Sequence, residues 1–159
     1  MKKFFQHTAY FIAYGIWWFL SLLPFWALYL LSDGLYLLMS HVVRYRHRVI
    51  WHNLRTSFPE KSEDELRQIE KNFYKWFCDY IVETVKLITM SKEQLLKRMT
   101  FTGVEKLNQY AAEGRSVGVY LGHLGNWEWI TSLPYWTQNA TCCQLYHPLE
   151  NEYFDRLFK

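Results

Sequence analysis

A glycine-flanked histidine is the residue best placed for chemistry in this sequence. His123 lies in the segment GHLGNWE, directly after the apolar stretch SVGVYL, whose composition is that of a buried strand. Ligands of parallel sheets bind outside the carboxyl ends of the strands, which is where His123 would then lie. An imidazole can take a proton from a hydroxyl group near neutral pH, and a neighbouring carboxylate, here Glu128, would fix its tautomer. Spacing alone is weak evidence, because His147 and Glu152 repeat it, and a packed or solvent-facing histidine is the alternative.

Other kinds of site fit the sequence less well. It contains neither a G-x-S-x-G nucleophile elbow nor a phosphate-binding P-loop. Cys142 and Cys143 are adjacent, with no second pair at zinc-binding spacing, and are better interpreted as strand residues. His41, His47 and His52 do not share one helical face, which argues against a metal site. We therefore expect no metal and no other cofactor.

The N-terminal quarter has the composition of a membrane segment. Asp33 is the only charged residue between Phe4 and Val43, and residues 12–31 form an uncharged run long enough to cross a bilayer core as a helix. Pro24 interrupts this run, and a proline inside a helix kinks or breaks it. Two arrangements stay open: a tilted span followed by an interfacial helix over residues 25–44, or a short hairpin. A buried helix of a soluble protein is the alternative.

A basic run follows the apolar segment. Arg44, Arg46, Arg48 and Arg55 come before the first acid, Glu60. The positive-inside rule places this side in the cytoplasm, where the arginines would lie against anionic headgroups; a solvated arginine face is the alternative. We divide the chain accordingly into a membrane anchor, residues 1–45, and a second domain, residues 46–159.

The second domain is expected to mix helices and strands. A capping box at Ser62 and a helical apolar period predict a long helix over residues 63–89. Three further helices and three β-prone stretches are predicted: helices over 91–99, 104–112 and 127–133, and strands over 100–102, 116–121 and 140–146. The alternation indicates an α/β fold in which transmembrane or interfacial helices precede a mixed, mostly parallel sheet.

Length, charge and cysteine content narrow the class of protein. The 159 residues amount to about one domain, and the last of them look like the start of another helix, which suggests the front part of a larger domain, from a truncated gene product or a fragment. A net charge of +3 is too small for a dedicated nucleic-acid binder. Three cysteines without paired spacing favour reduced thiols over a disulfide scaffold.

Three segments together resemble the lipid A biosynthesis acyltransferases, the lauroyl/myristoyl transferase family. GHLGNWE resembles the H-x-x-x-x-D/E active-site motif of that family. Residues 48–59, RVIWHNLRTSFP, resemble its R-x-x-x-x-N-L-x-x-x-F-P signature, and residues 146–151, YHPLEN, resemble its Y-R-P-x-x-N segment. His147 departs from the arginine usual there, so a permanently charged phosphate ligand is replaced by a largely neutral one.

The resemblance implies a membrane-bound acyltransferase at the cytoplasmic face of the inner membrane. The acyl donor would be an acyl carrier protein thioester and the acceptor a hydroxyl of a lipid A precursor, with no nucleic acid as partner. His123 would act as general base and Glu128 would orient it. Residues expected to bind substrate or shape the site are Gly125, Asn126, Trp127, Tyr146, His147 and Asn151. Three alternatives stay open: an inactive membrane-anchored remnant, a membrane interaction protein, and an acyltransferase acting on a glycerophospholipid.

Overall fold

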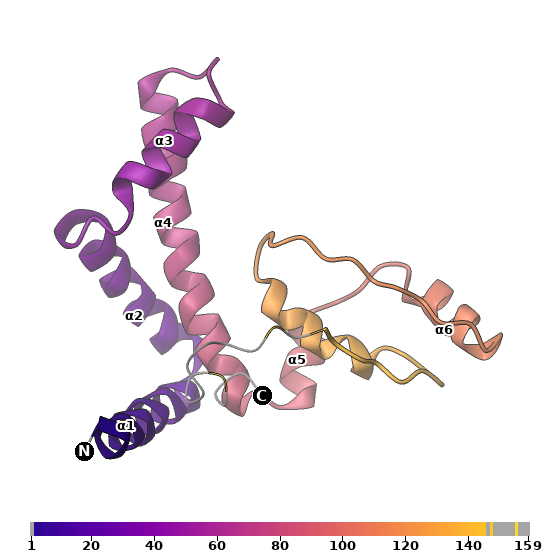
Figure 1. Cartoon of the computed structure of the whole chain (residues 1–159). Helices are drawn as coiled ribbons and strands as arrows, with labels where there is room; N and C mark the ends of the chain where they lie inside the picture. Colours follow the sequence, from indigo (N-terminus) through magenta and orange to yellow (C-terminus); the bar gives the residue numbers. More distant parts are fainter. Residues whose placement is uncertain (1, 146, 148–154, 156–159) are drawn as a thin grey trace. The chain divides into compact units, whose positions relative to one another are not determined.

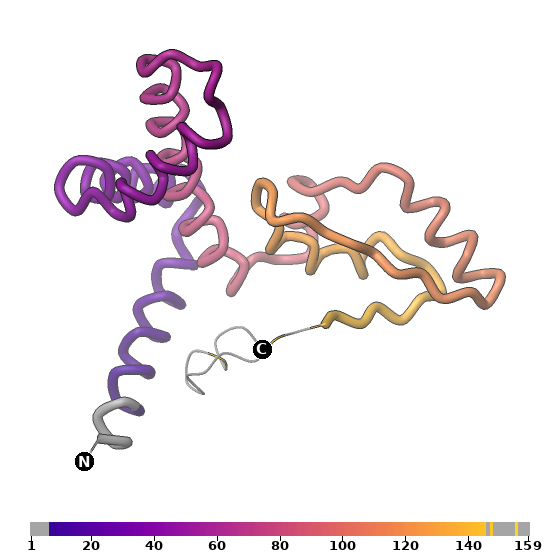
Figure 2. The backbone as a smooth tube through the Cα atoms, turned by 45° about the horizontal axis from the view of Figure 1, so that its top comes forward, coloured from indigo at the N-terminus to yellow at the C-terminus, as the bar shows by residue number. Residues whose placement is uncertain are grey.

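The computed structural model describes residues 2–145, His147 and Asp155 (Figures 1 and 2). Among these residues, side chains are described from His7 onward. Helices account for every regular element in this part of the chain. In order they are α1 (Lys2–Leu22), α2 (Phe25–Leu37), the π-helix η1 (Leu38–Val42), α3 (His47–Ser57), α4 (Glu63–Lys86), the 3-10 helix η2 (Leu87–Thr89), α5 (Lys92–Arg98), α6 (Val104–Ala112) and the 3-10 helix η3 (Trp127–Tyr135). The chain divides into two compact units, Leu23–Lys86 and the remainder, which are described separately.

The unit Leu23–Lys86 is a small helical bundle built on α4. Both α2 and α3 pack along α4 (Figure 1). The buried side chains of α4 recur mostly every four residues and so form one stripe along the helix: Leu66, Tyr74, Cys78, Val82 and Lys86. Leu28 of α2 is buried in the same unit, with 1 % of its surface exposed.

Polar bonds reinforce the contact between α2 and α4. The Ser32 hydroxyl donates to Oδ1 of Asp79 at 2.6 Å, and Ser32 is only 1 % exposed. One turn earlier in α2 and one turn later in α4, the Tyr29 hydroxyl donates to Oε1 of Glu83 at 2.9 Å. Because a buried polar group is costly when unpaired, the bond from Ser32 favours one register of the two helices.

The second unit joins α1 to the chain that follows α4. The Thr89 hydroxyl donates to the carbonyl oxygen of Ser21 at 2.6 Å, and Ser21 is fully buried. Further along, α5 lies against η3, and the Lys92 ammonium lies 5.3 Å from the ring centre of Tyr135. Asn108 of α6 accepts a hydrogen bond from the backbone N–H of Gln138 at 2.7 Å.

The predicted helix boundaries are confirmed where capping residues set them. The backbone N–H of Ser62 donates to Glu65 at 2.9 Å, which lowers the pKa of that carboxyl, and the Glu65 N–H donates back to the Ser62 hydroxyl at 3.4 Å. Ser91 caps α5 by accepting from the Gln94 N–H at 3.3 Å. Gly114, just after α6, has a φ of +72°, the left-handed conformation that commonly ends a helix.

The predicted α/β fold is wrong for the described residues, which contain no strand or sheet. Residues 116–121 have the composition of a strand but lie exposed and unpaired, with Tyr120 at 99 % exposure. Residues 100–102 and 140–145 are not strands either, and residue 146 lies outside the described residues. Composition marks a chain as able to pair, whereas a strand also needs a neighbour that completes its hydrogen bonds.

The predicted transmembrane helix is also corrected. Pro24 separates α1 from α2, at a φ of −66° and an extended ψ of 155°, so that the apolar run of residues 12–31 is divided between two helices. Among the described residues, no single helix has both the length and the apolar character needed to cross a membrane. One bent pair, Phe25–Val42 with His47–Ser57 at 87°, meets those criteria when taken together. A domain boundary at residue 45 stays a prediction.

Candidate functional site

The GHLGNWE segment forms an open turn that leads into η3. The Leu124 N–H donates to the carbonyl oxygen of Gly122 at 2.8 Å. Gly125 follows with a φ of +62°, a left-handed conformation that side chains rarely adopt, which accounts for a glycine here. Asn126 comes directly before η3, so Trp127 and Glu128 lie in its first turn.

The predicted general base is exposed on this turn. The ring of His123 lies edge-on to that of Trp127, with centroids 4.8 Å apart and planes at 70°. The turn therefore brings His123 together with Trp127. The pairing of His123 with Glu128 stays a prediction.

The remaining predicted site residues lie later in the chain. Tyr146 and Asn151 are outside the described residues, and His147 is described and exposed. The assignment of these three residues to substrate binding stays a prediction.

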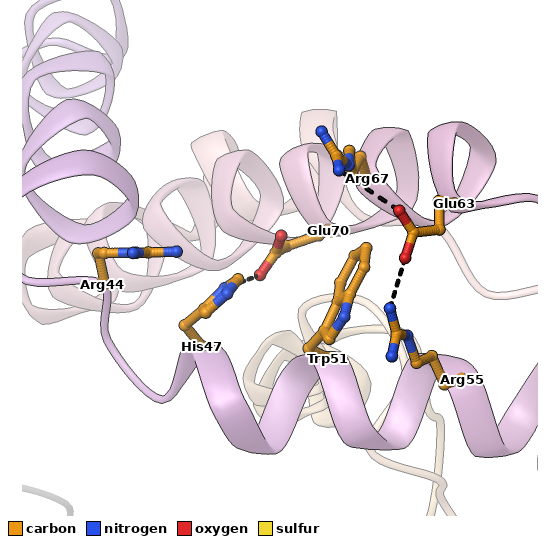
Figure 3. A pocket seen from close by; sticks show the side chains of 7 residues that line it. All are labelled: Arg44, His47, Trp51, Arg55, Glu63, Arg67 and Glu70. Carbon is orange, nitrogen blue, oxygen red and sulfur yellow. Dashed lines mark hydrogen bonds and ion pairs between the residues drawn. The ribbon is translucent and has the colours of Figure 1, made fainter.

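A second site lies in the bundle, between the facing sides of α3 and α4. It is a hollow of about 440 Å³ (Figure 3). Its lining comes from the turn before α3, from α3 and from α4: Arg44, His47, Trp51, Arg55, Glu63, Arg67 and Glu70. The three residues of α3 are spaced four apart, and those of α4 are spaced four and three apart, so each set occupies one helical face.

A histidine–carboxylate hydrogen bond and an arginine–carboxylate ion pair join the two helices across this hollow, and a further ion pair lies within α4. His47 Nδ1 lies 2.6 Å from Oε1 of Glu70. The Arg55 guanidinium lies 2.5 Å from Glu63, and Arg67 reaches the other oxygen of the same carboxylate at 3.4 Å (Figure 3). These pairs fix the orientation of the charged groups around the hollow.

Trp51 forms the aromatic wall of the hollow. Arg55 lies over its ring, 5.1 Å from the centroid, and the His47 ring stacks at 6.2 Å with a tilt of 21°. An aromatic face bordered by cations and carboxylates can contact a ligand that is both apolar and charged.

The turn before α3 adopts an unusual backbone conformation. Arg44 and Arg46 have φ values of +50° and +52°, and each such non-glycine residue costs about 1–3 kcal/mol. Tyr45, between them, is held by α4: its carbonyl oxygen accepts from the Tyr74 hydroxyl at 2.8 Å, and its ring stacks on Phe77 at 5.8 Å. Packing on α4 thus stabilises a turn that the chain would not favour by itself.

A further hollow of about 330 Å³ adjoins the same turn. It is lined by Arg44, Arg46, His47, Arg48 and Val49, with no carboxylate among them. Arg44 and His47 border both hollows.

Comparison with known protein families identifies the chain. A family model described as bacterial lipid A biosynthesis acyltransferase matches residues 1–159. The chain belongs to this family. The resemblance inferred from the three sequence segments is thereby confirmed, and the chain is assigned to a family of acyltransferases. No curated protein and no solved structure matches it.

For this acyltransferase, the sequence predicted arginines on one side of the hollow between α3 and α4, but not the residues that α4 contributes to it. The basic run from Arg44 to Arg55 was predicted to meet anions, but Glu63, Arg67 and Glu70 were not included. Their spacing on one face of α4, opposite a basic helix, is the signal that could have added them. Within the described part of the acyltransferase, no group of three His, Cys, Asp or Glu residues is placed to hold a metal ion.

Proposed function

We propose that this chain transfers a fatty acyl group from an acyl carrier protein thioester to a hydroxyl group of a lipid A precursor. The observation that carries the proposal is the family match over residues 1–159, which include the GHLGNWE turn. The exposure of His123 supports it, because a general base must reach the acceptor hydroxyl.

The chemistry begins with proton transfer to His123. The imidazole takes the proton of the acceptor hydroxyl as the oxygen forms its bond to the thioester carbonyl carbon. The C–S bond then breaks, and the leaving thiolate takes the proton from the imidazolium. Glu128 stabilises the imidazolium, which requires the turn to bring its carboxylate toward His123 when the acceptor binds. Gly125, Asn126 and Trp127 shape the turn.

The later segment extends the same proposal. Tyr146, His147 and Asn151 would contact a substrate. A neutral imidazole at position 147 would hold a phosphate less strongly than the arginine usual in the family.

Attachment to the inner membrane at its cytoplasmic face belongs to the same proposal, with residues 1–45 as the anchor. It is supported by large apolar side chains exposed on α2, among them Trp26 at 69 % and Leu30 at 63 %. The arginines that follow would favour anionic headgroups.

The test measures transfer of radiolabel from acyl carrier protein to a lipid A precursor in detergent. The chain should label the lipid, and His123→Ala should lower the rate by about 10²–10⁴-fold, the usual contribution of a general base. Glu128→Gln should lower it less. His52→Ala, which removes an exposed histidine of α3, is the matched control and should leave the rate unchanged.

Two outcomes would overturn parts of the proposal. Equal rates with acyl coenzyme A and acyl carrier protein would remove the carrier protein as the specific donor. No transfer from either the parent chain or His123→Ala would show that this chain is catalytically inactive, in spite of its family.

A further inference from the structure

A stripe of exposed residues on α2 has no role in the acyl-transfer chemistry described above. We propose that this stripe is a docking surface for an apolar helix of another protein, one that carries a single lysine or arginine among its apolar residues. This inference rests on the proposed function in one respect, namely that α2 lies in or against a membrane. The charge of the partner is inferred from the residues of the stripe itself.

The residues of this stripe, which we call the α2 stripe, are Trp26, Leu30, Asp33 and Leu37. They are spaced four, three and four apart, so they lie on one face of the helix. The three apolar members are each more than half exposed, and the aspartate is exposed as well. The buried residues of α2, Leu28 and Ser32, lie on the opposite side of the helix. The α2 stripe is therefore turned away from the side of α2 that is buried in the bundle.

Asp33 gives the α2 stripe its charge, and it is also the only charged residue between Phe4 and Val43. It forms no hydrogen bond or ion pair with a described residue. By contrast, two carboxylates of α4, those of Asp79 and Glu83, accept hydrogen bonds from hydroxyl groups of α2. The packing of α2 on α4 thus provides partners for these two carboxylates but not for Asp33.

The surroundings of Asp33 indicate what kind of group would pair with it. A carboxylate among apolar side chains is costly to place in a membrane unless a cation pairs with it. Leu30 and Leu37 lie one turn before and one turn after Asp33, so the cation has to arrive with apolar surface on both sides. A helix with one lysine or arginine presents its charge in this way. A lipid carries its charge at one end of its acyl chains, and the carboxylate would repel an anionic headgroup.

A second copy of this chain is a less favourable occupant of the α2 stripe. In a twofold-symmetric contact the same surface of both copies meets, so two Asp33 carboxylates would lie in one apolar interface. The two like charges would repel each other, and neither would gain a cation. A partner helix of opposite charge avoids both costs.

The test measures energy transfer from the tryptophans of the full chain to a dansyl-labelled peptide in detergent micelles at neutral pH and low ionic strength. The peptide is a helix of about twenty leucine and alanine residues with one central arginine. Matched peptides have leucine or glutamate at that position. The arginine peptide should bind about three- to tenfold more tightly than the leucine peptide, the usual effect of a polar contact between membrane helices. The glutamate peptide should bind no more tightly than the leucine peptide.

Changing the charge of Asp33 makes the test specific. Asp33→Asn should remove the preference for the arginine peptide, and Asp33→Lys should transfer that preference to the glutamate peptide. Both substitutions are at an exposed position, so the bundle should still fold, which circular dichroism checks. Asp64→Asn removes an exposed carboxylate from α4 and should leave the preference unchanged, which controls for net charge.

Three results would overturn the proposal. Equal affinity of the parent chain for the arginine and leucine peptides would show that Asp33 does not select a cation. A preference that persists in Asp33→Asn would place the contact elsewhere on the chain. Self-association of the chain that needs Asp33 but no peptide, measured by sedimentation equilibrium, would make a second copy the occupant.

Vesicle flotation and acyl transfer separate this inference from the proposed function. Without peptide, the parent chain and Asp33→Asn should float equally with phosphatidylglycerol vesicles and should transfer acyl groups at the same rate. A parent chain that did not float, yet kept its Asp33-dependent preference in micelles, would contradict the membrane attachment alone. Flotation and acyl transfer without that preference would contradict the docking surface alone.

Discussion

The bundle Leu23–Lys86 and the chain that follows α6 satisfy their backbone hydrogen bonds in different ways. In the bundle, each helix completes its own ladder, and side chains such as Leu28 and Cys78 are buried against neighbouring helices. Residues 116–121 have the composition of a strand but no partner strand among the described residues, and their side chains are exposed. The backbone hydrogen bonds of the first region are therefore completed within each helix, whereas a strand in the second region would need a partner from elsewhere in the chain.

The largest expected difference between the two regions is in amide hydrogen exchange. Amides in the middle of α4 should exchange at least about a thousandfold more slowly than those of residues 117–121, because opening a packed helix costs several kcal/mol. Exchange measured by mass spectrometry on peptides from both regions checks this. Comparable protection in the two regions would show that residues 117–121 pair as a strand, which would remove the contrast.

A matched pair of leucine substitutions compares the regions by stability. Leu28→Ala should lower the free energy of unfolding by about 2–5 kcal/mol, because it leaves a cavity at a residue that is 1 % exposed. Leu124→Ala, in the GHLGNWE turn, changes a residue that is 88 % exposed and should alter stability by less than about 0.5 kcal/mol. Denaturant unfolding in detergent measures both. Similar losses would mean that the turn is packed.

The same contrast explains what the sequence could predict about the fold. Helical periodicity and the capping residues Ser62, Ser91 and Gly114 act within a few residues, and they located α4, α5 and α6 closely. The stretch SVGVYL was assigned as a strand on its composition, yet strand pairing depends on a partner elsewhere in the chain. The sequence predicts a kink or break at Pro24 and leaves a tilted span and a hairpin open; in the structure the proline separates α1 from α2.

For the candidate sites, motif and geometry gave different information. Three sequence segments together, GHLGNWE among them, predicted the family, and the family match confirms it. The role of His123 and its pairing with Glu128 stay predictions, because the pairing depends on the conformation of the turn, which spacing alone does not fix. The sequence predicted the arginines near Trp51 but not the carboxylates that face them, because those carboxylates lie on the next helix. The pairing of these charges follows only from the structure, which places one face of α3 opposite one face of α4.

The reactivity of the buried Cys78 can be compared with that of the exposed Cys142 and Cys143, and the expected difference is smaller than the one in hydrogen exchange. Burial raises the pKa of the Cys78 thiol to about 11, with the negative charge of Asp79 adding to the effect. Its thiolate fraction at pH 8 should therefore be about a hundredfold below that of a thiol with the usual pKa of about 9. Cys142 and Cys143 are exposed. Alkylation with iodoacetamide followed by mass spectrometry should modify these two first.

The pH dependence of Cys78 follows from the same pKa. The folded state favours the neutral thiol, so its contribution to stability is complete below pH 9 and is lost as the pH rises through about 11. Alkylation of Cys78 in the folded chain should speed up over that range. Rapid modification of Cys78 at pH 8 would show that α4 is not packed at that position.

The smallest expected effect comes from Tyr74→Phe, which removes one hydroxyl between α4 and the strained turn. Loss of the 2.8 Å bond to the Tyr45 carbonyl should lower stability by about 0.5–1.5 kcal/mol.

Burial raises the pKa of Tyr74, with Glu70 adding to the shift and Arg44 opposing it, so the phenol stabilises the fold below about pH 10 and this contribution is lost above it. The variant should therefore lose less stability between pH 9 and 11 than the parent chain. Tyr120→Phe, at 99 % exposure, is the control and should match the parent at every pH. If the variant and the parent had the same alkaline profile, the tyrosine hydroxyl would not hold the turn on which Arg44 depends.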